Sequence, residues 1–96
     1  MLTGKQKRYL RKTSHPLRPI FQVGKEGVNE NMLIQINEAL EKRELIKVNV
    51  LQNCPEDKDD VKEAILEGTE AELVQMLGNV ITLYKLSAEN KTIQLP

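Results

Sequence analysis

The sequence predicts a single domain of the α/β (α+β) class, in which helices pack on a mixed four-stranded sheet. Three segments show the 3.6-residue apolar spacing of helices, and four short runs are rich in β-branched and apolar residues. Their order is helix, strand, helix, strand, helix, strand, strand. Strand–helix–strand units favour parallel pairing with a right-handed crossover, whereas two strands joined by a two-residue turn must be antiparallel. The expected sheet is therefore mixed.

The first helix is expected to begin at about Gly4, because Thr3 and Gln6 have the spacing of a capping box. It should end at residues 14–16, since Pro16 disfavours helical geometry in the residue before it. The helix is expected to dock by a narrow stripe, which at about 100° per residue consists of Tyr9, Leu10 and Thr13.

The middle of the chain predicts a strand, a helix and a second strand. The first strand is expected over residues 20–23, between Pro19 and Gly24. Asn29 is a favourable N-cap for the second helix, which should run to about Arg43. Residues 45–51 follow as a strand in which apolar and polar residues alternate.

The last part of the chain predicts a helix, a hairpin and a tail. The acidic stretch 55–60 has the composition of a helix start, and Gly68 is expected to end that helix. Two apolar runs, 73–77 and 80–86, are separated by Gly78-Asn79, a two-residue hairpin turn. Residues 87–96 are weakly patterned. We therefore expect one domain over residues 1–96, with an ordered core over about 2–86 and a C-terminal tail over 87–96.

The composition excludes several classes of protein. With 96 residues and 40% hydrophobic residues, the chain can bury one small core. Its apolar runs fall far short of the roughly 20 residues that cross a bilayer, and its start lacks the apolar run of a signal peptide. Cys54 is the only cysteine, so neither an intramolecular disulfide nor a cysteine-based metal site can form. We expect a cytoplasmic protein that needs no membrane and no cofactor.

The zero net charge hides a strong segregation of charge. Residues 1–25 hold seven of the 14 cations and no acid, and the rest of the chain holds the other seven cations and all 14 acids. The seven N-terminal cations are Lys5, Lys7, Arg8, Arg11, Lys12, Arg18 and Lys25. A solvated helix normally mixes signs to gain ion pairs three and four residues apart. The N-terminal segment is therefore expected to bind a polyanion.

The GKEG loop, Gly24-Lys25-Glu26-Gly27, lies between the first expected strand and the second expected helix. Its glycines allow a tight turn and close approach of a ligand, and Lys25 and the helix N-terminus add positive charge, which suits a phosphate. By itself such a loop is more often a plain turn, and it matches no nucleotide-hydrolysis motif. Glu26 is discordant, and either faces solvent or bonds a base or ribose hydroxyl. The basic segment that ends in this loop favours the binding interpretation.

Other candidate site residues have simpler interpretations. His15 has no partner for catalysis and fits the end of a helix, while the carboxylates of residues 56–60 fit a helix start better than a metal site. We therefore expect neither an enzyme nor a metal site. Three aromatic residues could stack on bases, but the apolar pattern favours core packing for each of them: Tyr9, Phe21 and Tyr84.

Several stretches in order resemble the CRM domain (chloroplast RNA splicing and ribosome maturation), and in particular the stand-alone bacterial YhbY-like proteins. The stretches that carry the resemblance are Leu2–Arg11, Gln22–Val28, Ala39-Leu40, Glu44–Val48, Glu72–Gln75, Gly78 and Leu83–Lys85. Together they cover almost the whole chain.

The resemblance implies a fold similar to the C-terminal domain of translation initiation factor three. It also implies RNA binding through the GKEG loop and the neighbouring basic surface, and association with ribosomal RNA in precursors of the large subunit. We expect a monomer that takes no small-molecule substrate. The alternative that the charge pattern leaves open is a protein-interaction module, whose basic helix docks on an acidic protein partner.

Overall fold

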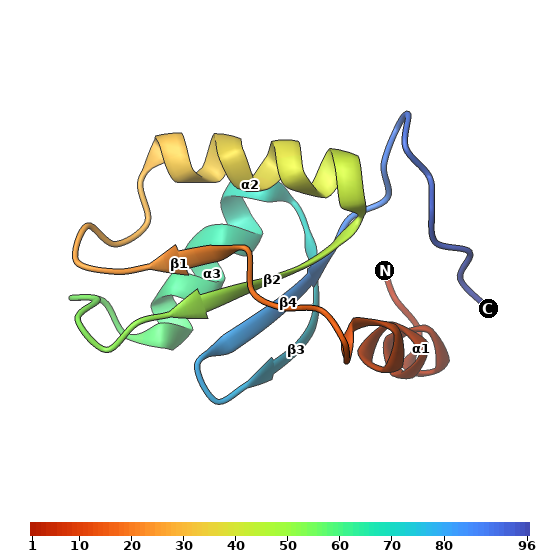
Figure 1. Cartoon of the computed structure of the whole chain (residues 1–96), viewed down its shortest axis with the longest axis horizontal. Coiled ribbons are helices and arrows are strands. Elements are labelled where there is room, and N and C mark those ends of the chain that lie inside the picture. The colour runs from red at the N-terminus through yellow and green to blue at the C-terminus, as the bar shows by residue number, and fades with distance from the viewer.

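The computed structural model describes all 96 residues and has the predicted order of elements (Figure 1). The helices are α1 (Gly4–Ser14), α2 (Glu30–Arg43) and α3 (Lys58–Thr69), and the strands are β1 (Phe21–Val23), β2 (Leu45–Val50), β3 (Glu72–Leu77) and β4 (Val80–Tyr84). The N-cap at Asn29 and the turn at Gly78 lie where the sequence places them. The predicted fold class is confirmed.

The four strands form one mixed sheet in the order β1-β2-β4-β3. β1 pairs with β2 in parallel over only three residues, Phe21–Val23 against Val48–Val50. β4 runs antiparallel to β2 on one side and to β3 on the other. β1 and β3 are therefore the two edges of the sheet.

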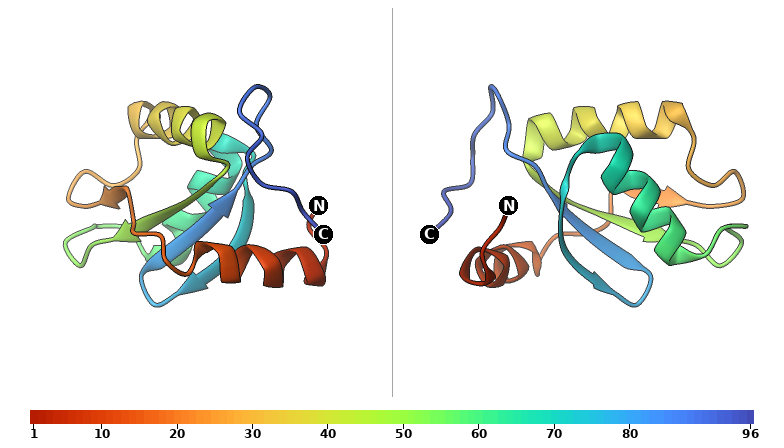
Figure 2. Two further views of the ribbon diagram at one scale, coloured as in Figure 1. Left: turned by 45° about the vertical axis from the view of Figure 1, so that its right-hand side comes forward. Right: turned by 180° about the vertical axis from the view of Figure 1, so that it is seen from behind.

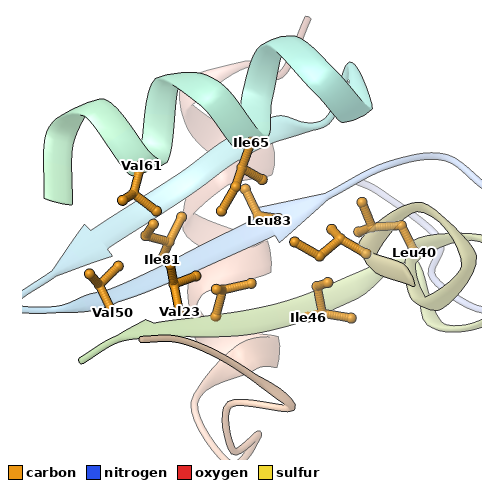
Figure 3. Close-up of a cluster of buried hydrophobic side chains, with 10 residues drawn as sticks. Val23, Leu40, Ile46, Val50, Val61, Ile65, Ile81 and Leu83 are labelled. Carbon is orange, nitrogen blue, oxygen red and sulfur yellow. The ribbon is translucent and has the colours of Figure 1, made fainter. Parts of the chain in front are cut away.

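Helices α2 and α3 cover one face of the sheet, and α1 lies on the other (Figures 1 and 2). The core between the sheet and α2 and α3 is built from ten buried side chains, which Figure 3 shows converging from the strands and both helices. They are Val23, Ile36, Leu40, Ile46, Val48, Val50, Val61, Ile65, Ile81 and Leu83. Burial of branched aliphatic side chains, each contributing roughly 1.5–3 kcal/mol, is the main stabilising term.

A second, smaller cluster seats α1 on the opposite face. It consists of Leu10, Leu45, Val74 and Tyr84, with Ile93 and other partly buried residues around it. Val74 lies at the register shift between Leu73 and Gln75 in β3 and points to this face, as Tyr84 does. α1 is therefore held by a small cluster that takes side chains from three strands.

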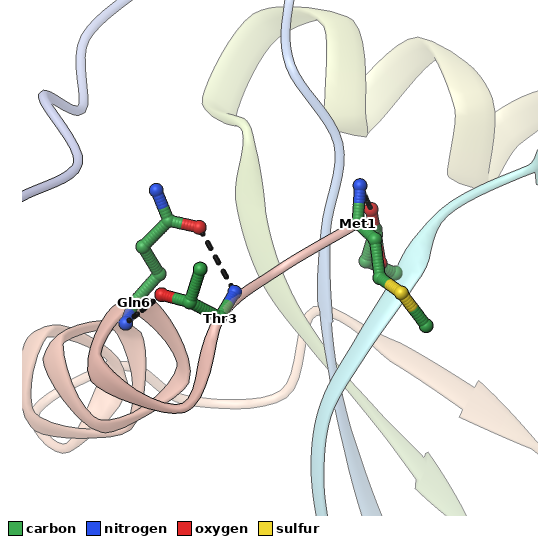
Figure 4. Close-up of polar contacts among 4 residues, drawn as sticks. Met1, Thr3 and Gln6 are labelled. Carbon is green, nitrogen blue, oxygen red and sulfur yellow. Dashed lines mark hydrogen bonds and ion pairs between the residues drawn. The ribbon is translucent and has the colours of Figure 1, made fainter.

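The start of α1 has the predicted capping box. The backbone amide of Gln6 donates to Thr3 Oγ1 at 3.1 Å, and the backbone amide of Thr3 donates to the side-chain Oε1 of Gln6 at 3.0 Å (Figure 4). The N-terminal ammonium of Met1 lies 3.1 Å from Glu72 on β3. The chain start is thus tied to the sheet edge that α1 covers.

The predicted docking stripe of α1 is wrong in part. Leu10 is fully buried, but the second buried residue is Ser14, and Tyr9 remains 40% exposed. The helix therefore docks by the arc around Leu10 and Ser14, which is rotated away from Tyr9. The Ser14 hydroxyl can be buried because it donates to the Arg11 carbonyl at 2.9 Å.

Gly68 does not end α3, which continues to Thr69 and is capped by Glu70 in a left-handed conformation with φ 59°. A Cβ at position 68 would lie 2.6 Å from Cδ1 of Leu33 on α2. The glycine is therefore required for close packing of α2 and α3 rather than for the helix end.

The C-terminal residues are held against the end of α2 by two carboxylates. Glu44, fully buried, accepts hydrogen bonds from the amides of Ser87, Thr92 and Ile93 at 2.8, 2.7 and 3.0 Å. Glu41 accepts from the Ser87 hydroxyl and from the amides of residues 88 and 89. This segment has no helix or strand, and its order comes from side-chain acceptors that propensity rules do not reveal.

We expect acid to release this segment. Hydrogen bonds from the Ser87 hydroxyl and the following two amides lower the pKa of Glu41 from 4.5 to about 2. Burial alone would raise the pKa of Glu44, but its amide donors outweigh burial and lower it. Because the pKa of Glu41 lies below that of the unfolded chain, the stabilisation from its hydrogen bonds is complete above about pH 4.5 and is lost as the pH falls towards about 2. The pKa of Glu44 is also lowered, so the stabilisation from its hydrogen bonds is likewise lost only below pH 4.5. NMR shifts of the Ala88 and Ile93 amides should follow this transition, and a midpoint near pH 4.5 would contradict it.

Candidate nucleic-acid interface

The exposed side of α1 carries three cations with an aromatic ring among them. Lys5, Arg8, Tyr9 and Lys12 follow the i, i+3, i+4, i+7 spacing of one helix face, and all four are exposed. This face is uncovered because α1 docks on the sheet by the opposite arc, around Leu10 and Ser14. A basic face with an aromatic ring can hold phosphates and stack on an unpaired base.

The other two cations of α1 lie nearer the sheet. Lys7 and Arg11 are half-buried beside the docking arc, whereas Arg18, in the linker after α1, is exposed. The ion pairs of the structure join Met1 to Glu72 and Lys62 to Glu63, so none of the seven N-terminal cations is neutralised by a carboxylate. Their positive field is therefore not cancelled by a paired carboxylate.

The GKEG loop is a tight turn closed by the Gly27 amide, which donates to the Gly24 carbonyl at 3.0 Å. Gly27 has φ 67°, a left-handed conformation that favours glycine. The side chains of Lys25 and Glu26 are exposed, and their amides make no hydrogen bond within the protein. Two consecutive amides beside a mobile ammonium can bind an anion.

A carboxylate from a neighbouring loop occupies part of the expected phosphate cradle. Glu56 Oε1 accepts from the Val28 amide at 3.2 Å, and a Cβ on Gly27 would lie only 2.4 Å from the same oxygen. The sequence suggests that Glu56 belongs to a helix start, but it lies before α3 and reaches across to this turn. An anion at the GKEG loop must therefore bind at the Lys25–Glu26 side, away from Glu56.

The structure does not gather the predicted residues into one cluster. Helix α1 and the GKEG loop lie towards opposite ends of the molecule in all three views (Figures 1 and 2). Arg18 and the linker come between them along the chain, and β1, an edge strand, leads to the loop. The predicted residues are thus spread along the length of the molecule from α1 through Arg18 to the GKEG loop, and we refer to them together as the track.

Sequence reasoning missed two residues near this track. Glu56 was assigned to the helix start because acidic residues are common there, and nothing local links it to Gly27. Arg43, in the last turn of α2, lines a hollow together with Arg18. Only the tertiary fold brings residues so distant in sequence together.

The structure contains no group of three or more His, Cys, Asp or Glu side chains placed to hold a metal ion. It also contains no helix with the length and apolar character needed to cross a membrane.

Comparisons with known proteins agree with the fold and extend over the whole chain. The chain is 68% identical over 96 residues to the Bacillus subtilis protein named "Probable RNA-binding protein YqeI", with complete coverage of both chains. It is 41% identical over 95 residues to a Haemophilus influenzae protein named "RNA-binding protein", covering 99% of this chain and 95% of that protein.

A solved structure and a family model give the same result. The solution structure of a hypothetical protein from Staphylococcus aureus matches with a TM-score of 0.81 and 58% identity, covering 100% of both chains. The model of the CRS1 / YhbY (CRM) domain matches residues 2–85. The chain belongs to the CRS1/YhbY (CRM) domain family.

Proposed function

We propose that this chain is an RNA-binding protein that holds the backbone of single-stranded RNA along the track from α1 to the GKEG loop. The observation that carries the proposal is the set of seven N-terminal cations, none paired with a carboxylate, on one segment of an otherwise acidic chain. Its relatives named as RNA-binding proteins support it. Membership in this family also agrees with the expectation that the chain is not an enzyme.

The residues divide into three roles. Lys5, Arg8 and Lys12 on the exposed face of α1 bind phosphates, with Arg18 continuing the positive charge beyond the helix. The GKEG loop binds a further phosphate through the amides of residues 25 and 26 and the Lys25 ammonium. Phosphate contacts of this kind fix the position of the RNA without reading its sequence.

We further propose that the RNA is ribosomal, that the protein acts on precursors of the large subunit during ribosome assembly, and that it works in the cytoplasm as a monomer. The resemblance to the stand-alone bacterial members supports this assignment. Sedimentation of cell extracts should place the protein with precursors of the large subunit, and crosslinks should map to their RNA. A protein found only in RNA-free fractions would contradict the ribosomal assignment.

We expect binding to depend strongly on salt. If about six cations each neutralise one phosphate of single-stranded RNA, log K should fall against log salt with a slope near about −4. Titration of a labelled unstructured RNA at several salt concentrations measures this slope. A slope near zero would rule out the backbone-binding mechanism. If this chain had no affinity for RNA at low salt but captured an acidic protein, a protein-interaction module would be favoured instead.

A further inference from the structure

A small hollow opens at the edge of the sheet beside the linker between α1 and β1. Its volume is about 170 Å³ and its lining is mainly apolar, consisting of Leu17, Arg18, Ile20, Arg43, Leu45 and Ile46. Leu45 and Ile46 are buried residues of β2 that line the hollow from the sheet edge, while Leu17 and Ile20 line it from the linker and are 39% and 43% exposed. The two arginines are the only charged residues of the lining, and both are exposed.

The hollow follows from the different lengths of the two ladders on β2. β4 pairs with β2 from Leu45 to Asn49, but β1 pairs with it only from Val48 onward. Leu45 and Ile46 therefore have a strand neighbour on one side alone. The linker passes this edge and is fixed there by Lys47, whose ammonium donates to the Leu17 carbonyl at 3.1 Å and whose carbonyl accepts from the Ile20 amide at 3.0 Å. The hollow is thus part of the fold and has rigid support.

We propose that this hollow binds an unstacked base of single-stranded RNA, with the flanking phosphates held by Arg18 and Arg43. This inference rests on the proposed function and adds a base-binding subsite to the backbone track. An apolar cavity of about 150 Å³ accommodates benzene in an engineered protein, so the 170 Å³ hollow suits a single pyrimidine ring. Arginine contributes both a charge for phosphate and a planar group that stacks on a base.

The position of the hollow agrees with this role. Its wall is formed by the linker, which joins α1 to β1 and so connects the two ends of the track, and an RNA strand following the track passes it. The other hollow of the molecule, about 250 Å³, is lined by two carboxylates, Glu56 and Asp57, and one cation, Lys58, so its net negative charge disfavours an RNA backbone. A mainly apolar lining and paired cations occur together only at the linker hollow.

The decisive comparison is between two neighbouring cations of α2. Arg43→Ala should weaken binding of an oligouridine of roughly ten nucleotides by about tenfold, because a phosphate contact and a stacking contact are lost together. Lys42→Ala removes the same charge one residue away, from a side chain outside the hollow, and should weaken binding less than about twofold. Equal losses from the two variants would overturn the proposal.

A second pair of variants and a second ligand test the base itself. Ile20→Gln should weaken oligouridine binding, whereas Ile34→Gln, at an exposed isoleucine of α2 outside the hollow, should leave it unchanged. Methyl NMR signals of Leu45 and Ile46 should shift with oligouridine and remain unmoved by an abasic ribose-phosphate strand of the same length. Identical shifts with both ligands would contradict base binding while leaving backbone binding intact. Absence of salt-dependent binding by either strand would instead contradict the proposed function.

Discussion

Replacing Glu44 by Ala should lower the free energy of unfolding by about 2–4 kcal/mol, since three amides lose their charged acceptor. These amides belong to Ser87, Thr92 and Ile93, and no other acceptor within the protein serves them. Loss of the bonds should also free Ile93 from the cluster that seats α1. Urea unfolding followed by circular dichroism measures the change, and α1 should become less protected against amide exchange.

Glu70 provides a matched control for Glu44. Both glutamates cap a helix with a positive φ, 64° at Glu44 and 59° at Glu70, although only Glu70 lies in the left-handed region. Alanine carries the same Cβ as glutamate, so the substitution changes the backbone strain little at either site. Glu70 is exposed and its side chain makes no hydrogen bond, so Glu70→Ala should change the free energy of unfolding by less than about 0.5 kcal/mol. Similar losses from both variants would show that the carboxylate contacts of Glu44 do not explain its importance.

The helices and strands of this fold are predictable because each follows local rules. The capping box at Thr3, the N-cap at Asn29 and the turn at Gly78 each act within a few residues of the chain. The β-branched runs then have few ways to pair, and the short turn forces the last two strands together. Local signals of this kind were sufficient for the order, type and approximate bounds of all seven elements.

The errors concern contacts between segments distant in sequence. Gly68 resembles a helix stop, but its role is set by Leu33 on another helix. Tyr9 is an aromatic residue of the kind expected in a core, yet it is exposed because α1 docks on the sheet by Leu10 and Ser14. The aromatic prediction holds for Tyr84, which is buried, and Phe21 packs only partly buried against the core.

The candidate site, like the fold, was predicted from the sequence only where its residues are recognised by local patterns. The cations and the GKEG loop are visible in the sequence, because a segment free of acids stands out in a chain with 14 acids. Glu56 and Arg43 are not visible, since their importance depends on a loop and a linker that reach them only in the fold. The assignment of these residues to RNA stays a prediction, and charge reversal on α1 tests it most strongly.

Reversal of two charges on the exposed face of α1, Arg8→Glu with Lys12→Glu, should weaken binding to single-stranded RNA by about 100-fold. In about 0.1 M salt, each phosphate contact contributes roughly fivefold through counterion release, so two lost contacts remove about 25-fold. Repulsion between the new carboxylates and the backbone supplies the remainder. Titration of the variant at a fixed salt concentration measures the loss, and the salt slope should become shallower by about 1.4.

A control variant with the same change in net charge distinguishes the effect of where the reversed charges lie from the effect of the total charge of the protein. Lys42 and Lys91 are both exposed cations outside α1 and the GKEG loop, and Lys42, like Lys12, lies in the last turn of its helix. Reversing both should weaken binding less than about fivefold, because a screened charge outside the contact acts only at long range. Each double variant should unfold within about 1 kcal/mol of the original chain, since the reversed side chains are exposed and only the helix-dipole contribution of the last turn changes. Equal loss of affinity in the two variants would show that net charge alone drives binding. In that case the exposed face of α1, with Tyr9 among its cations, would have no specific role.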